Sequence, residues 1–159
     1  MIDADFRAIV ESAHLCFAAT VTPDGKPSLS PKGTVRVLDD RHLFFLDIAS
    51  PGTRANLEVN PWMEVNVVDQ LSRRGYRCFG RASIHRGDAI FAQATGQVFA
   101  EEGMSYEVES VIVLDIERVE PLWSPGYSHV PEEADVRTWW RARRAALDAD
   151  YDVYLKSTT

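Results

Sequence analysis

The sequence of 159 residues has little of what marks extracellular, membrane-spanning or nucleic-acid-binding proteins. Its two cysteines, Cys16 and Cys78, each lie inside an apolar run, which is typical of small buried side chains in a reducing compartment and not of a disulfide framework. Long apolar runs are missing, and so is a basic N-terminal stretch. Neither a membrane span nor a signal peptide is therefore predicted, and the expected location is the cytoplasm.

An excess of positive charge is also missing. The formal net charge is −7 at pH 7, whereas proteins that bind nucleic-acid backbones depend on clustered lysine and arginine. One basic cluster exists, at Arg141, Arg143 and Arg144, and we interpret it as the solvated face of a helix. The sequence therefore predicts no nucleic-acid partner.

The common catalytic and nucleotide-binding motifs are absent. The chain has no G-x-G-x-x-G, no Walker-type P-loop and no G-x-S-x-G elbow. His14, His42, His85 and His129 lie far apart in the sequence, without metal-ligand spacing, so no metal site is predicted and surface histidines are expected. Combinations of Ser, His and Asp can be assembled, but no spacing favours one of them, and no catalytic residue is assigned.

The features that are present indicate an α+β protein. A strand-like run over residues 15–22 ends at the turn Pro23-Asp24-Gly25, and the chain returns through residues 27–30 and 33–38. Further runs typical of strands occupy 43–48, 63–67, 76–85 and 107–119. Together these runs predict about six strands and an α+β protein built on an antiparallel barrel with short helices, and the alternation does not choose among barrel types.

Four helices are expected around the barrel. The first begins near Asp3 or Asp5, and the third begins after Asp88. The second opens at Pro51-Gly52-Thr53, with Thr53 as its natural cap. The last begins at about Pro131 and carries an apolar stripe formed by Val136, Trp140, Leu147 and Tyr151. We expect one domain over residues 1–159, with a core of about 11–120 and a helical extension over 121–159.

Two segments have the composition of a phosphate site. Ser30-Pro31-Lys32-Gly33-Thr34 offers a hydroxyl, a cation and a glycine where a ligand can approach the backbone. Gly52-Thr53-Arg54 opens a helix, whose free N–H groups favour an anion, and Arg54 adds a planar set of donors. Taken alone, either segment is more often ordinary solvated surface, so their order along the chain carries the argument.

That order resembles the FMN-binding split-barrel family related to pyridoxamine 5'-phosphate oxidase. The resemblance spans about Leu15 to Val119 and depends on ATVTPDGKPSLSPKG, GTRANLEVNP and VNVVDQLSRRGYRCFGRASI. It implies an antiparallel six-stranded split β-barrel with short flanking helices. It also implies FMN as the cofactor and a homodimer with flavin at the interface, touched by both chains. A small-molecule substrate is implied as well.

The resemblance also implies the site residues. Lys32, Thr53 and Arg54 would hold the flavin phosphate, with Ser30 assisting, and the backbone of Val35-Arg36-Val37 would face the edge of the isoalloxazine ring. Three further residues carried over to the flavin site are Gln70, Arg74 and Arg77.

Departures from the family pattern restrict the activity. Pro51-Gly52-Thr53 replaces the family's S-R-K helix start, and Gly75 replaces the glutamine of its R-Q-V-R-x-x-G segment. Nothing after Trp123 matches the R-x-H substrate motif of the true oxidase. Authentic oxidation of pyridoxamine 5'-phosphate is therefore not expected.

Several functions remain open at this point. The first hypothesis is an FMN oxidoreductase that moves hydride or electrons between a reduced nicotinamide and a small substrate. The alternatives are a flavin-storage or flavin-sensing protein without turnover and a deazaflavin F420-dependent reductase. Haem is disfavoured because no histidine lies in a family motif. Trp123 and Tyr127 could stack on a flavin or pack on the barrel, and the pair Trp139-Trp140 is a candidate dimer contact.

Overall fold

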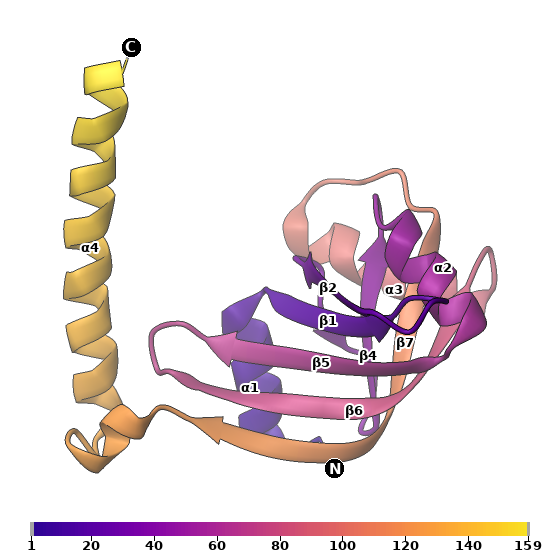
Figure 1. Ribbon diagram of the computed structural model, residues 1–159, viewed down its shortest axis with the longest axis horizontal. Coiled ribbons are helices and arrows are strands. Elements are labelled where there is room, and N and C mark those ends of the chain that lie inside the picture. Colours follow the sequence, from indigo (N-terminus) through magenta and orange to yellow (C-terminus); the bar gives the residue numbers. More distant parts are fainter. Residues whose placement is uncertain (1, 159) are drawn as a thin grey trace.

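A single curled antiparallel sheet forms the body of the protein (Figure 1), which we describe from a computed structural model covering residues 2–158, with side chains from 2 to 151. The strands are β1 Cys16–Val21, β2 Pro27–Lys32, β3 Arg36–Val37, β4 His42–Asp47, β5 Trp62–Asp69, β6 Arg74–His85 and β7 Ser110–Trp123. The helices are α1 Ala4–Ala13, α2 Pro51–Val59, α3 Ala89–Glu102, the 3-10 helix η1 Pro125–Ser128, and α4 Glu133–Thr158.

The predicted fold class is confirmed, with one correction to the strand count. The described chain has seven strands, not six. The return segment 27–38 does not run as one strand, because a turn at Gly33 and Thr34 separates β2 from the two-residue strand β3.

The strand order explains how the sheet becomes a half-barrel. The order is β2-β1-β5-β6-β7-β4-β3, so the two edge strands, β2 and β3, are neighbours in sequence. The short turn between them forces the sheet to curl until its edges meet. A hydrogen bond of 2.9 Å from Leu46 N–H to the buried Thr34 hydroxyl joins the turn after β2 to the end of β4. The end of β2 therefore lies beside the end of β4 and the start of α2, and we call this junction the β2–α2 seam.

Two apolar clusters stabilise the arrangement. The larger fills the inside of the curled sheet beneath α1, where the Phe6 and Tyr76 rings lie 4.8 Å apart. The smaller lies between α3 and strands β4 and β7, and includes Phe44, Val98 and Val111. Each cluster excludes water from one face of the sheet, which is the main source of stability for such a fold.

Capping residues set the helix starts. Asp3 accepts a 2.8 Å hydrogen bond from Phe6 N–H at the start of α1, and Asp88 accepts one of 2.8 Å from Phe91 N–H at the start of α3, as predicted. The predicted cap of α2 was wrong. Ser50 is the N-cap residue and Pro51 the first helical residue, so Thr53 lies buried inside the first turn.

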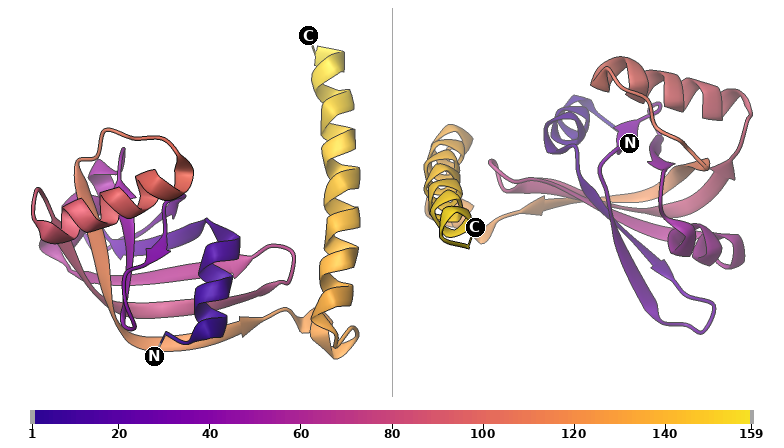
Figure 2. Two further views of the ribbon diagram at one scale, coloured as in Figure 1. Left: turned by 180° about the vertical axis from the view of Figure 1, so that it is seen from behind. Right: turned by 90° about the horizontal axis from the view of Figure 1, so that it is seen from above.

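The last helix leaves the barrel instead of packing along it (Figures 1 and 2). The first turns of α4 pack against the β5–β6 hairpin, where Val136 is buried. The Arg73 guanidinium lies over the Trp140 ring, 3.3 Å from the ring centroid. All side chains from 141 to 151 are exposed, so the predicted apolar stripe is covered only at its beginning. Within residues 2–158, no helix is both long enough and apolar enough to span a membrane.

Gly80 occupies a point where the sheet has no room for a side chain. A bulge shifts the β6–β7 register after Phe79, and a Cβ atom at residue 80 would lie 1.9 Å from the Asp115 carbonyl oxygen. We expect Gly80→Ala to lower the free energy of unfolding by about 1–3 kcal/mol or more, because such overlap forces the backbone apart.

Gly96 in α3 provides the matched control for this prediction. A Cβ there meets nothing within 4 Å, so Gly96→Ala should stabilise the protein by up to about 1 kcal/mol through helix propensity. Urea unfolding of both variants measures the two effects, and equal stabilities would contradict the proposed crowding at Gly80.

Candidate functional site

The predicted phosphate residues meet where β2 ends and α2 begins. Lys32 is only 4% exposed, and its ammonium donates hydrogen bonds of 2.7 Å to the hydroxyls of both Ser30 and Ser50. Ser30 lies two residues before Lys32 on β2, whereas Ser50 is the N-cap residue of α2. This lysine therefore ties the edge of the sheet to the helix N-terminus.

A buried carboxylate organises the other side of this site. Asp47 is fully buried at the end of β4; its side chain accepts hydrogen bonds from Ser50 N–H at 2.9 Å, the Ser110 hydroxyl at 3.1 Å and Arg54 Nη1 at 2.5 Å. Burial lowers the pKa of Lys32 from its ordinary value, and the charge of Asp47 opposes that shift. The carboxylate thus pairs directly with Arg54 and supports the charge of Lys32 from nearby.

A cavity of about 360 Å³ opens beside these groups. It is lined by Pro31, Lys32, Gly33, Thr34, Leu46, Ile48, Ala49, Ser50, Glu102 and Tyr106. The lining combines an ammonium group, hydroxyls and the N-cap residue of α2 with one carboxylate, that of Glu102, which pairs with Arg36. The Arg54 guanidinium does not line the cavity but lies close by through Asp47. This donor set suits a phosphate group, which helix N-termini and arginine both favour.

The remaining residues predicted on this side have internal roles in the chain. Thr53 is 5% exposed within α2, and Val35 is fully buried. The Arg36 side chain turns away to α3, where it pairs with Glu101 at 2.5 Å and Glu102 at 3.0 Å. Because β3 is an edge strand, the backbone of Arg36 and Val37 is paired only with β4 within the sheet. The predicted contact of this backbone with a flavin edge stays a prediction.

The predicted residues Gln70, Arg74 and Arg77 lie on another part of the sheet. The register runs from Pro31 through Phe17 and Asn66 to Arg77, so Arg77 is three strands away from the end of β2. That separation is about 14 Å at the usual strand spacing. Arg77 pairs with carboxylates on both neighbouring strands, at 3.2 and 3.6 Å, and Gln70 is exposed in the β5–β6 turn. One chain alone does not bring the two groups together.

Arg74 joins three elements that are distant in sequence. Its guanidinium pairs with Asp5 of α1 at 2.7 Å and with Glu133 of α4 at 2.7 Å. The Tyr76 hydroxyl, followed by Arg74, lowers the pKa of Asp5, and the hydrogen bond from Arg74 lowers the pKa of Glu133.

This cluster predicts a stabilising contribution that depends on pH. The carboxyl pKa values are lower in the folded state, so the contribution is present above the ordinary values of 3.8 and 4.5. It is lost as pH falls through the lowered folded values. We expect Arg74→Gln to reduce the loss of stability between pH 6 and pH 3, measured by denaturant unfolding; an unchanged pH dependence would contradict the assignment.

The glycine that replaces the family's glutamine has a physical explanation. A Cβ at Gly75 would lie 2.2 Å from the Val67 carbonyl oxygen and 2.9 Å from a Val68 methyl group. The β5–β6 hairpin is too close at this point for any side chain. The flavin contact that this glutamine would supply is therefore not available at residue 75.

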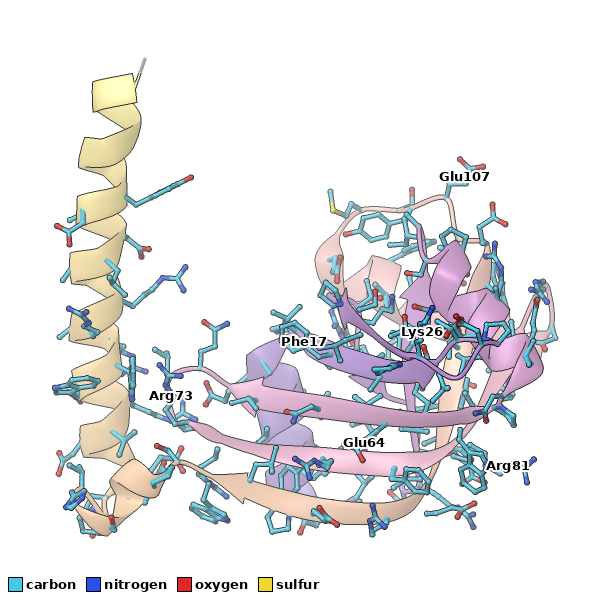
Figure 3. All side chains as sticks on the ribbon, in the orientation of Figure 1. Phe17, Lys26, Glu64, Arg73, Arg81 and Glu107 are labelled. Carbon is cyan, nitrogen blue, oxygen red and sulfur yellow. The ribbon has the colours of Figure 1, made fainter. Side chains whose placement is uncertain are left out.

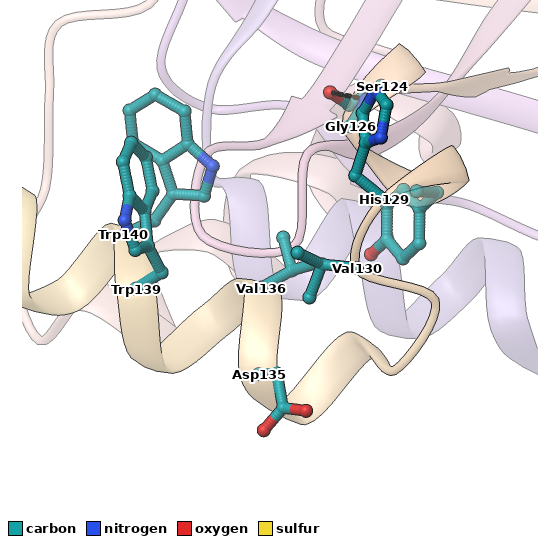
Figure 4. Close-up of a pocket in the computed structure, with 9 residues that line it drawn as sticks. Ser124, Gly126, His129, Val130, Asp135, Val136, Trp139 and Trp140 are labelled. Atoms are coloured by element: carbon teal, nitrogen blue, oxygen red, sulfur yellow. Dashed lines mark hydrogen bonds between the residues drawn. The ribbon is translucent and has the colours of Figure 1, made fainter.

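The aromatic residues of the tail pack on each other and on arginines. Trp123 and Tyr127 make an edge contact at 5.4 Å, and the Tyr127 hydroxyl donates to the Ser72 carbonyl at 2.6 Å. A cavity of about 520 Å³ lies between the η1 turn and α4. Trp139 and Trp140 line it (Figure 4), and their rings lie edge to face with centroids 4.6 Å apart. Trp139 is 59% exposed, so packing within the described chain accounts for Trp140 but leaves Trp139 largely in solvent.

Sequence reasoning missed Ser50 and Asp47. Ser50 could have been found, because a serine directly before Pro51 is a strong signal for a helix N-cap. Asp47 gives no such signal, since its partners come from β7 and α2. Among the described residues, no group of three or more His, Cys, Asp or Glu side chains is placed to hold a metal ion.

The curled antiparallel sheet, with a donor set suited to phosphate at the β2–α2 seam, is typical of a split-barrel protein. Comparison with known families supports this class. The profile of the family described as pyridoxamine 5'-phosphate oxidase matches residues 2–123, which is more than half of the chain. The chain belongs to this family. A search of curated proteins finds no match.

Solved structures show the same architecture. HupZ of Group A Streptococcus is 28% identical, with a TM-score of 0.70 over 78% of this chain and 96% of that one. An FMN-binding protein from Syntrophomonas wolfei subsp. wolfei is 14% identical (TM-score 0.60; 73% of this chain, 82% of that one). An F420 reductase is 18% identical (TM-score 0.60; 74% and 98%). The last two likenesses, at such identities, show the fold alone.

Proposed function

We propose that the protein binds FMN at the β2–α2 seam and acts as a flavin-dependent oxidoreductase on a small substrate. The observation that carries the proposal is Lys32, buried between the hydroxyls of Ser30 and Ser50 at the start of α2. Lys32 and Arg54 share the single buried carboxylate of Asp47, so a further anion in the open cavity would offset the cost of the buried ammonium. The terminal phosphate of FMN is such an anion, and family membership supports flavin as the group that carries it.

The bound group would supply the redox chemistry, and the chain would supply binding and orientation. Lys32, Ser30, Ser50 and Arg54 would hold the phosphate. The edge strand β3, next to the same seam, would present backbone groups to the ring. The electron donor is expected to be a reduced nicotinamide, and the unpaired buried cysteines fit a protein of the cytoplasm.

Identification of the ligand tests the proposal directly. We expect freshly purified protein to be yellow and to release FMN on denaturation, in about one copy per chain. Mass spectrometry that finds FAD, haem or no flavin would contradict it. Stopped-flow mixing with NADH or NADPH then separates an enzyme from a flavin-storage protein, since only the enzyme passes electrons on to an acceptor with turnover.

A second candidate is an F420-dependent reductase. The same phosphate residues could hold the phosphate of F420, and the fold shared with an F420 reductase supports this alternative. The absorption spectrum of the released ligand distinguishes the two cofactors. Production of pyridoxal 5'-phosphate is not expected with either of them, because the terminal substrate motif is absent.

A homodimer would complete the flavin site. No helix covers the face of β2, β1 and β5 that carries Phe17 (Figure 3). The apolar side chains of this face stay exposed, with Phe17 at 44% and Leu29 at 67%. A symmetric partner on this face would cover these residues. It would also bring a second set of residues such as Arg77, which projects from the same face, towards the flavin.

We therefore expect a mass of twice 17.9 kDa by light scattering. Phe17→Glu should yield monomers, because it places a charge in the interface. Val59→Glu, on an exposed valine of α2, should leave the dimer intact. A wild-type protein that remains monomeric at micromolar concentration would contradict the proposed assembly.

A further inference from the structure

A third hollow, a groove beside the start of α3, lies away from the proposed phosphate site. Its volume is about 570 Å³. It is lined by Leu38, Asp39, His42, Arg81, Ala82, Ser83, His85, Ile90, Gln93, Val113 and Asp115. Arg81, on the half of β6 that is distant from α4, marks its position in Figure 3.

Two side chains that line this groove, Ser83 and His85, form a continuous hydrogen-bonded chain with the neighbouring Asp88. The Ser83 hydroxyl lies 2.8 Å from His85 Nε2, and His85 Nδ1 lies 2.8 Å from Asp88 Oδ2. Both distances fall within the range of about 2.6–3.2 Å that links a nucleophile to its base and the base to the group that orients it. Ser83 is exposed, so a substrate can reach its hydroxyl.

We propose that Ser83, His85 and Asp88 form a hydrolytic site for small carboxylic esters. This site is independent of the flavin. The arrangement is that of nucleophile, general base and orienting acid, which is recognised by its geometry and not by its sequence spacing or fold.

Local structure explains why these residues meet. Ser83 and His85 are two residues apart on β6, so their side chains share one face of the strand. Gly87, with a φ of 65°, then turns the chain back, and Asp88 begins α3. Asp88 is held twice, because Oδ1 accepts from Phe91 N–H at 2.8 Å while Oδ2 faces His85. The helix cap therefore positions the acid before any substrate binds.

The electrostatics agree with this assignment of roles. The hydrogen bond from Phe91 N–H, followed by that from His85, lowers the pKa of Asp88, so the carboxylate is ionised at neutral pH. An ionised Asp88 favours the tautomer with the proton on Nδ1, which leaves Nε2 free to accept the proton of Ser83. Asp88 acts here as a positioning residue.

The reaction needs only the ester and water. Ser83 Oγ attacks the acyl carbon while its proton passes to Nε2. The bond to the alkoxide then breaks, and the alkoxide leaves as an alcohol with that proton. Water next attacks the acyl-serine, gives a proton to Nε2 and releases the carboxylic acid as Ser83 Oγ takes the proton back.

The walls of the groove indicate the kind of ester. Leu38, Ile90 and Val113 offer apolar surface to a short acyl chain. Arg81 and Gln93 line the same groove and carry the N–H groups able to donate to the oxygen of a tetrahedral intermediate. The groove is therefore suited to esters of short aliphatic acids.

The chain contains its own control. His42 and Asp39 form an equivalent pair at the same three-residue separation, with Nδ1 also 2.8 Å from the carboxylate, and His42 lines the same groove. The other ring nitrogen of His42 lies 3.6 Å from Asp115 and not beside a serine hydroxyl. Replacement of His42 therefore removes a comparable His–Asp pair without removing a nucleophile–base pair.

The experiment uses purified full-length protein, p-nitrophenyl acetate and butyrate, and a fluorophosphonate probe. We expect the probe to label Ser83, with the site found by peptide mass spectrometry. Ser83→Ala and His85→Ala should each lower ester turnover by about 100-fold or more, whereas His42→Ala, which changes only a wall of the groove, should lower it far less. Asp88→Asn, which retains a capping side chain, should lower kcat with little change in KM.

Absence of labelling at Ser83 in wild-type protein of native circular dichroism would overturn the proposal. So would ester turnover that survives Ser83→Ala, or a His42→Ala variant that loses as much turnover as His85→Ala. Ligand release and FMN affinity are measured separately, so failure of the flavin proposal does not affect this test.

Discussion

Replacing Asp47 with asparagine is expected to lower the free energy of unfolding by about 3–5 kcal/mol, the usual effect of removing one partner from a buried ion pair. Asp47 has no exposed side-chain surface, and it accepts hydrogen bonds from Arg54, Ser50 and Ser110. Without the carboxylate, Arg54 would lose its ion-pair partner and the buried Lys32 would lose a nearby charge that favours its ammonium form. The same change should therefore weaken both the seam and the start of α2.

Thermal unfolding by circular dichroism measures this effect. For a chain of this length, the loss corresponds to a fall in Tm of roughly 6–20 °C. Asp115→Asn is the matched control, because Asp115 is 43% exposed in its pair with Arg41 and such pairs contribute at most about 1 kcal/mol. If the two variants unfold at the same temperature, Asp47 is not the organising charge of the site.

Local patterns predicted most of the fold because they act within a few residues. The turn at Pro23-Asp24-Gly25, the caps Asp3 and Asp88 and the two-residue alternation of β5 all depend on neighbours in the chain. The break between β2 and β3 could not be found in this way. It arises because the sheet curls and closes at Gly33, which is a property of the strand order and not of the local sequence.

In the candidate sites, too, local sequence reveals residues of one segment but not contacts between distant segments. Lys32 and Ser30 were predicted because they lie on one segment, and the structure brings Ser50 to them. Arg74 was assigned to the flavin by its place in a family segment, yet its partners Asp5 and Glu133 come from helices near the two ends of the chain. His42 and His85 are distant in sequence but line one groove. Contacts of this kind depend on strand pairing, so the spacing of residues could not reveal them.

Removal of the Arg54 guanidinium is expected to weaken FMN binding. Charge-assisted hydrogen bonds to a phosphate are worth roughly 1.5–3 kcal/mol, so Arg54→Ala should raise the Kd for FMN by about ten- to 150-fold. Riboflavin lacks the phosphate, and its affinity should change little. Fluorescence titration of both apoproteins with both flavins measures the difference, and equal FMN affinities would remove Arg54 from the site.

The pair with Asp47 makes a second variant necessary. Arg54→Ala also leaves a fully buried carboxylate without its cation, so part of any loss could come from a damaged seam. Arg54→Lys retains a positive charge for Asp47 but loses the planar fork that can hold two phosphate oxygens. If Arg54 contacts the phosphate, the lysine variant should unfold near the wild-type temperature and still bind FMN more weakly, with riboflavin unaffected. If Arg54 only supports Asp47, the positive charge of lysine is sufficient, and Arg54→Lys should have both the stability and the FMN affinity of the wild type.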